Sequence, residues 1–190
     1  MGALCRQMKR SGHRVHFTWE SMKGVRLIGN LNKSHLELTS HSPEQTQRLG
    51  IRIGELALPG DILLLVGALG AGKTCLTQGI AWGLGIEEYA LSPSFVIIRE
   101  LHGRLPLYHI DLYRLDHIEE IAELSLDDYL YGSGVCVVEW AEKGLSVLPA
   151  EHLLIQISYL SDSERSFQFK PSGKRYLEIL KQLKRLPLSS

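Results

Sequence analysis

The clearest pattern in the chain is an uninterrupted apolar run, Ile62–Val66, followed at once by a glycine-rich segment and then by a stretch with helical periodicity. Consecutive apolar residues of this kind are typical of a strand that is covered on both faces of a sheet. We therefore predict a buried central strand at Ile62–Val66, a tight loop after it, and a helix over residues 73–84.

A second helix is predicted ahead of this strand. Ser42 is a good N-cap residue, Pro43 suits the first helical position, and Glu44 places an acid in the first turn. The pattern continues to about residue 57, with apolar side chains on one face at Leu49, Ile53 and Leu56.

The rest of the chain alternates short apolar runs with short helical stretches. We predict strands over residues 94–101, 105–110, 135–138, 153–159 and 166–169. Helices are predicted over residues 117–124, 126–130 and 174–186. His102-Gly103 would join the first two strands as a hairpin, and Ser161-Asp162-Ser163 the last two.

Length and composition limit the architecture. A chain of 190 residues with 44% hydrophobic content supports one compact core. We expect a single domain over residues 35–190 and a poorly ordered extension over residues 1–34, whose basic residues are scattered. A basic arm that touches RNA is the alternative for this extension, although nucleic-acid patches are usually dense.

Charge and cysteine content narrow the function classes. Lys plus Arg (21) balance Asp plus Glu (21), so nothing global attracts this chain to a polyanion. The three cysteines, Cys5, Cys75 and Cys136, share no metal-ligand spacing and are too few for a disulfide framework. With no apolar run near the roughly 18 residues that span a bilayer, we expect a cytoplasmic protein without a membrane partner.

The glycine-rich segment carries the most specific chemistry. Residues 67–74 read G-A-L-G-A-G-K-T and fit the phosphate-loop pattern G-x-x-x-x-G-K-[ST]. A Cβ at Gly67 or Gly72 would obstruct the tight turn around a phosphate, and the following helix directs its free N–H groups at the anion. Lys73 can bridge the β- and γ-phosphates, and the Thr74 hydroxyl can bind magnesium. We predict ATP and Mg²⁺ as ligands.

Two acids could complete the metal site, because phosphate-loop proteins place a carboxylate at the end of a neighbouring strand. Asp111 follows one predicted strand and Glu139 follows another. Either one could instead cap a helix or face solvent. Glu139 ends the more hydrophobic strand and is our preferred magnesium ligand, whereas Asp111 is the better candidate for a cap.

Four motifs in this order and spacing resemble the TsaE family, the ATPase component of bacterial tRNA threonylcarbamoyladenosine (t6A) synthesis. They are the phosphate loop, Ser92-Pro93-Ser94-Phe95, the run from His109 to Arg114, and Val138-Glu139-Trp140. The resemblance covers roughly residues 36–159. It implies a P-loop NTPase-like α/β fold, a three-layer sandwich whose mostly parallel central sheet has antiparallel extensions.

The resemblance also implies a function and a set of roles. The protein would be cytoplasmic and weakly ATP-hydrolysing, would associate with TsaD and TsaB, and would meet tRNA only through that complex. The transferase chemistry belongs to TsaD. By position, Thr74 and Glu139 would bind magnesium, and Asp111 and Lys73 would act in catalysis. The nucleotide would be held by Leu69, Gly70, Ala71, Gly72, Lys73, Thr74 and Cys75, with Ser92-Pro93-Ser94 as a switch segment and Trp140 beside the site.

This sequence departs from the family pattern near the phosphates. Ala68 stands where the family usually has Asp or Glu, which affects the hydrolysis rate more than binding. Cys75 replaces a usual threonine at a helix N-terminus, where a thiol pKa tends to fall, so a redox role is an alternative to a simple small residue. For His109, packing as a structural residue is preferred over proton transfer beside Asp111.

Two other functions fit a phosphate loop. A small-molecule kinase is the main alternative, but the chain has no arginine-dense insertion between Gly67 and Glu139 where a lid would lie. A GTPase switch would need the guanine-selecting N-K-x-D signature, which the sequence lacks.

Overall fold

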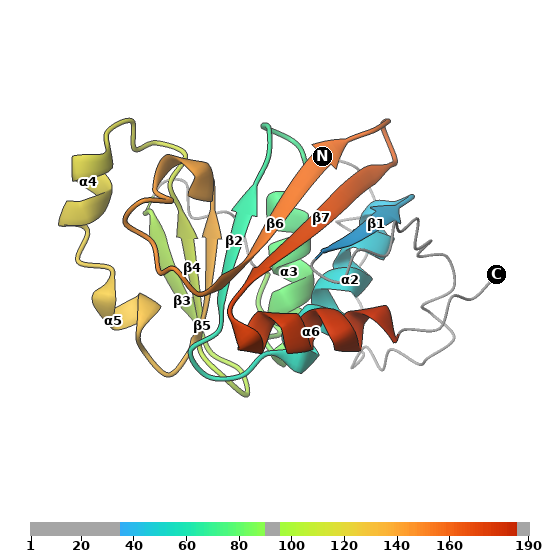
Figure 1. The fold of residues 1–190 in the computed structure, drawn as a ribbon, viewed down its shortest axis with the longest axis horizontal. Helices are drawn as coiled ribbons and strands as arrows, with labels where there is room; N and C mark the ends of the chain where they lie inside the picture. Colours follow the sequence, from blue (N-terminus) through green and yellow to red (C-terminus); the bar gives the residue numbers. More distant parts are fainter. Residues whose placement is uncertain (1–34, 90–95, 186–190) are drawn as a thin grey trace.

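A seven-stranded sheet forms the centre of the molecule in the computed structural model, which describes residues 35–89 and 96–185. The strand order is β1-β7-β6-β2-β5-β4-β3 (Figure 1). The strands are β1 (Leu36–Ser40), β2 (Ile62–Val66), β3 (Ile98–Leu101), β4 (Leu107–Asp111), β5 (Val135–Glu139), β6 (His152–Tyr159) and β7 (Arg165–Ser172).

The middle of the sheet is parallel and its edges are antiparallel. The four strands β4, β5, β2 and β6 run parallel to one another. β3 pairs antiparallel with β4, β7 with β6, and β1 with β7. The mostly parallel sheet with antiparallel extensions is therefore confirmed. The last two predicted strands do not form an edge, because β6 pairs with β2 inside the sheet and β1 pairs with β7 at the edge. β1 was not predicted.

Alternation along the central strands creates two cores. Leu63 and Leu65 of β2 belong to one cluster, which includes side chains of α2 (Pro43–Leu56), α3 (Lys73–Gly83) and α6 (Lys174–Lys184). Ile62 and Leu64 belong to the other, which includes side chains from α4 (Ile118–Glu123) and α5 (Asp127–Leu130) and Ala141 of the 3-10 helix η3 (Ala141–Lys143). The sandwich is thus three-layered, since successive side chains of a strand point to opposite faces.

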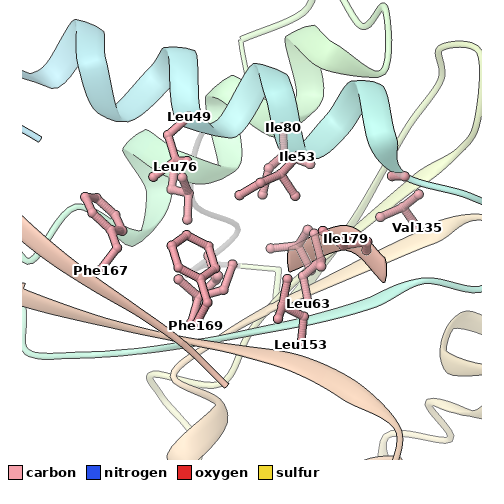
Figure 2. Close-up of a cluster of buried hydrophobic side chains, with 14 of the residues drawn as sticks. Leu49, Ile53, Leu63, Leu76, Ile80, Val135, Leu153, Phe167, Phe169 and Ile179 are labelled. Atoms are coloured by element: carbon pink, nitrogen blue, oxygen red, sulfur yellow. The ribbon is translucent and has the colours of Figure 1, made fainter. Parts of the chain in front are cut away.

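Figure 2 shows the larger core, in which side chains from α2 and α3 face those of the strands. Phe167 and Phe169 of β7 and Ile53 of α2 are among its fully buried members. Because α2 and α3 pack together against the sheet, this core fixes the direction in which α3 leaves the loop after β2.

Glycines allow α2 and α3 to pack in backbone contact. A Cβ at Gly50 would collide with the carbonyl of Leu76, and one at Gly79 would collide with the carbonyl of Gln47. Larger residues at these positions would push α3 away from α2 and move the loop that precedes it.

Most predicted helix boundaries hold within one or two residues. Ser42 caps α2 by accepting a 3.2 Å hydrogen bond from the N–H of Gln45, as expected. The predicted strand over residues 94–101 begins only at Ile98, and residues 1–34, 90–95 and 186–190 lie outside the described residues. None of the helices in the described ranges has the length and apolar character needed to cross a membrane.

Candidate functional site

The loop between β2 and α3 has the backbone geometry that its glycines predict. Gly67, Gly70 and Gly72 have φ angles of 149°, 75° and 106°, a region that L-residues with a Cβ rarely adopt. A Cβ on Gly67 would also collide with the carbonyl of Ile157 on β6. The loop therefore lies close against β6, at the carboxyl end of β2.

Lys73 begins α3 and turns back over this loop. Its Nζ donates to the carbonyls of Gly67 (2.6 Å) and Ala68 (3.0 Å), and it lies 3.6 Å from the centre of the Trp140 ring. Burial lowers the pKa of Lys73, and the nearby carboxylates of Glu139, Glu142 and Asp111 oppose that effect. The ammonium is thus held in the loop by neutral acceptors that a phosphate could replace.

Glu139 is in direct contact with Thr74 of the loop. It ends β5 beside Leu65 of β2 and is only 2% exposed. Three donors lie within hydrogen-bond distance of its carboxylate: Thr74 Oγ1 (2.9 Å), Thr77 Oγ1 (3.1 Å) and His109 Nε2 (2.8 Å). The structure therefore brings Thr74 and Glu139, the two predicted magnesium ligands, into direct contact.

Asp111 lies on the neighbouring strand, paired in register with Glu139. It is 2% exposed, and its Oδ1 accepts a 2.9 Å hydrogen bond from the N–H of Tyr113. The bond closes a turn after β4, so the capping interpretation of Asp111 describes part of its environment. Its proposed role in catalysis stays a prediction.

Aromatic side chains form one wall of the site. Trp140 follows Glu139 with φ at 59°, in the left-handed region, and packs against Tyr113 with ring centroids 4.9 Å apart. Lys143 fixes the segment that carries Tyr113 by donating to the carbonyl of Leu115 at 2.9 Å. Trp140 was expected beside the site and lies against Lys73 of the loop, a contact that was not foreseen.

Arg165, at the start of β7, braces the loop from the other side. Its Nε donates to the carbonyl of Ala71 (3.1 Å), and its Nη1 donates to the carbonyls of Ser161 (2.6 Å) and Glu164 (2.8 Å). The guanidinium also lies over the ring of Tyr159, 4.6 Å from its centroid. The turn between β6 and β7 is thus tied to the phosphate loop.

The expected drop in the thiol pKa of Cys75 is wrong. Burial raises the pKa of Cys75 to about 11, Glu44 adds to the shift, and Arg165 opposes it only in part. Desolvation disfavours the thiolate at this position, so the redox alternative loses its basis.

The other nucleotide-binding candidates lie along the loop and the first turn of α3. Leu69 is 76% exposed, and an added Cβ on Gly70 would meet nothing within 4 Å. The outer side of the loop is therefore open to a ligand. The switch candidates Ser92, Pro93 and Ser94 fall outside the described residues.

The residues present fit a magnesium ion that arrives with a nucleotide. Within residues 35–89 and 96–185, no group of three or more His, Cys, Asp or Glu side chains could hold a metal ion by itself. Magnesium usually keeps several waters and takes one or two protein ligands together with substrate phosphates. The Thr74 hydroxyl and the Glu139 carboxylate, which touch beside the loop, supply a donor set of that size.

Two residues of the site were missed by the sequence reasoning. Thr77 follows Thr74 by three positions, so helical spacing alone places both hydroxyls on one face of α3. Arg165 gave no such signal, because it reaches the loop from a strand that follows it by more than 80 residues. The ring of His109 is buried and hydrogen bonded to Glu139, which agrees with the preferred interpretation, and its role in proton transfer is untested.

Comparison with known proteins agrees with the family resemblance that the motifs indicate. The sequence model of one protein family, described as "Threonylcarbamoyl adenosine biosynthesis protein TsaE", matches residues 40–167. A relative from Bacillus subtilis (strain 168), named "tRNA threonylcarbamoyladenosine biosynthesis protein TsaE", is 46% identical over 145 residues, which cover 76% of this chain and 90% of the relative. A relative of the same name from Treponema pallidum (strain Nichols) is 42% identical over 130 residues, covering 68% and 96%.

One solved structure has a closely similar fold. The crystal structure of Bacillus subtilis YdiB superposes with a TM-score of 0.71 at 40% sequence identity, over 85% of this chain and 97% of that one. The resemblance read from the motifs is therefore confirmed over most of the described residues.

Proposed function

This chain belongs to the TsaE family, and on that premise we propose that it is an ATP-binding, weakly ATP-hydrolysing component of tRNA threonylcarbamoyladenosine (t6A) synthesis. It supports the modification of tRNA and does not itself transfer the threonylcarbamoyl group. It binds ATP together with Mg²⁺ and acts in the cytoplasm.

One observation carries the nucleotide part of this proposal. Lys73, Thr74 and Glu139 converge at the carboxyl ends of β2 and β5, the edge of a parallel sheet at which α/β proteins bind ligands. Each of the three has a chemistry that phosphoryl transfer requires: a mobile positive charge, a hydroxyl ligand and a carboxylate.

The chain's own groups have distinct tasks in this account. The N–H groups of the loop and of the first turn of α3 bind the phosphates, and Lys73 exchanges the carbonyls of Gly67 and Ala68 for phosphate oxygens. Thr74 and Glu139 hold Mg²⁺, which when bound neutralises charge on the phosphate oxygens. Asp111, two residues past His109 on β4, orients the water that attacks.

A low basal rate follows from the loop itself. Ala68 offers no carboxylate beside the phosphates, and phosphoryl transfer depends mainly on positioning and charge neutralisation. We expect the partners TsaD and TsaB to raise this rate, and tRNA to meet the chain only through them. The balanced charge of the chain agrees with that indirect role.

ATP turnover by the purified chain, measured alone and with TsaD and TsaB added, tests this function. The proposal predicts slow turnover alone and a clear increase with both partners, provided that Mg²⁺ is present. A rate that the partners leave unchanged, together with phosphate transfer to a small-molecule acceptor, would favour a kinase instead.

A further inference from the structure

The two carboxylate oxygens of Glu139 have different partners. Within the described residues, Oε2 accepts a 2.9 Å bond from Thr74, which faces the phosphate loop. Oε1 points into the sheet, where Nε2 of His109 lies 2.8 Å away and the hydroxyl of Thr77 lies 3.1 Å away. One oxygen is thus tied to the protein interior, and the other is left beside the candidate metal ligand Thr74.

Of the two donors to Oε1, His109 has no competing acceptor among the described residues, whereas Thr77 has one. The hydroxyl of Thr77 is 3.1 Å from Oε1 and also 3.1 Å from the carbonyl of Lys73, and its single proton serves one acceptor at a time. A carboxylate offers only acceptors, so Nε2 of His109 carries the proton of their bond.

Within the described residues, the imidazole of His109 makes no polar contact other than the one to Glu139. Its side chain is fully buried, and its Nδ1 makes no hydrogen bond in that part of the chain. A buried ring nitrogen without a partner costs stability relative to an apolar side chain of the same size. Among the described residues, the polar contact of this ring is the bond to Glu139, which points to a role at the site.

Rigid neighbouring strands hold the pair together. His109 on β4 is in register with Val137 on β5, one strand period before Glu139. Both strands lie inside the sheet, so neither backbone can shift without breaking ladder hydrogen bonds. The His109–Glu139 bond therefore sets the orientation of the carboxylate plane, not only its location.

We propose that His109 is a positioning residue that fixes Oε1 of Glu139 and so directs Oε2, next to the Thr74 hydroxyl, at the divalent cation of a bound nucleotide. This inference rests on the magnesium–nucleotide function proposed above. Partners that orient a metal ligand typically account for 10- to 100-fold in metal affinity.

The variants His109→Met and His109→Gln separate positioning from packing. Methionine fills similar space without a donor, and the glutamine amide nitrogen is as many bonds from the backbone as Nε2 of the imidazole. Thr77→Val, which keeps its shape and loses its hydroxyl, reports the weaker donor. His109→Asn offers the same amide as glutamine but is one bond too short to reach Oε1.

The measurement is the affinity of the full chain for ADP by calorimetry, first in EDTA and then across a Mg²⁺ titration, with the melting temperature of each unliganded variant alongside. We expect His109→Met to raise the Mg²⁺ concentration at half-effect by roughly 10- to 100-fold. ADP affinity in EDTA should change less than about threefold, His109→Gln should recover most of the loss, and Thr77→Val should fall between.

Three outcomes would overturn the inference. His109→Met could need no more Mg²⁺ than the wild type, ADP affinity could fall equally with and without Mg²⁺, or glutamine could perform no better than methionine. If the methionine variant does not fold, His109→Asn decides in its place. If the ADP affinity of the wild-type chain does not depend on Mg²⁺, the proposed function itself is contradicted. A failure of this inference can therefore be told apart from a failure of the proposed function.

Discussion

The hydroxyl of Thr74, in the first turn of α3, donates a 2.9 Å hydrogen bond to Oε2 of Glu139 at the end of β5. The two residues are 65 positions apart in the sequence. Their contact joins the phosphate loop to the strand beside it, so anything that binds between them must rearrange this bond. Occupancy of the loop is thereby linked to the segment after Glu139, where Trp140 contacts Lys73.

Asp111 should matter for turnover and little for binding. In Asp111→Asn the retained oxygen still accepts from the N–H of Tyr113, so the turn after β4 should persist. Loss of a carboxylate that positions water should lower partner-stimulated ATP turnover roughly 100-fold, with ADP affinity within about threefold of the wild type. Asp128→Asn, an exposed change on α5, is the matched control. Full turnover in Asp111→Asn would remove Asp111 from the reaction.

Arg165 should support the shape of the phosphate loop. Arg165→Met removes the donors to Ala71, Ser161 and Glu164 together, and hydrogen bonds from a charged group contribute about 1.5–3 kcal/mol. We expect ADP affinity, measured by calorimetry, to fall about tenfold. Arg165→Lys keeps the charge without the planar fork and should recover little of the loss. A lysine variant equal to the wild type would show that charge alone is needed.

The pair Asp61–Arg175 should anchor α6 to the start of β2. Arg175 donates from Nε to Oδ1 (2.8 Å) and from Nη2 to Oδ2 (2.6 Å) of Asp61, which is almost fully buried. Arg175→Met removes the charged partner of that carboxylate and leaves it the N–H of Leu58. It should reduce the free energy of unfolding by about 2–3 kcal/mol, measured in urea. Lys181→Met, which breaks an exposed pair with Glu178, should cost less than about 0.5 kcal/mol. Equal losses in the two variants would argue against a special role for the buried pair.

Cys75 should react slowly with thiol reagents. Because burial raises its pKa to about 11, the thiolate is scarce at pH 8, and the alkylation rate should be roughly 100-fold below that of an ordinary cysteine. The rate should climb about tenfold per pH unit above pH 8, since the thiolate fraction rises toward the shifted pKa. Iodoacetamide labelling of a Cys5→Ser variant, followed by mass spectrometry of the Cys75 peptide, measures it. Fast labelling at pH 7 would contradict the burial argument.

The sequence predicted those parts of the fold that depend on local patterns. The apolar run of β2, the glycines after it and the cap at Ser42 are each determined by neighbours within a few residues. β1 was missed, although Leu36 and Leu38 alternate with polar residues, because five residues alone do not reveal a partner strand. That partner, β7, pairs Leu36 with Phe169, 133 positions away.

The same distinction between local and long-range features applies to the site. The phosphate loop and the acids at the ends of the two strands were evident from motif and position. The bond from His109 to Glu139 and the brace from Arg165 depend on strand order and register, which no local pattern specifies. The pKa of Cys75 was misjudged because helix position is visible in the sequence and burial is not.

The most direct test of the central claim is the t6A content of tRNA. Bacterial cells that lack their own TsaE-family protein would receive this chain or its Lys73→Ala variant at matched protein levels, and nucleosides from their tRNA would be quantified by mass spectrometry. The account predicts that the wild-type chain restores t6A and that Lys73→Ala does not, because Lys73 is the cation of the phosphate loop. Equal restoration by the variant would contradict a nucleotide-driven role in t6A synthesis.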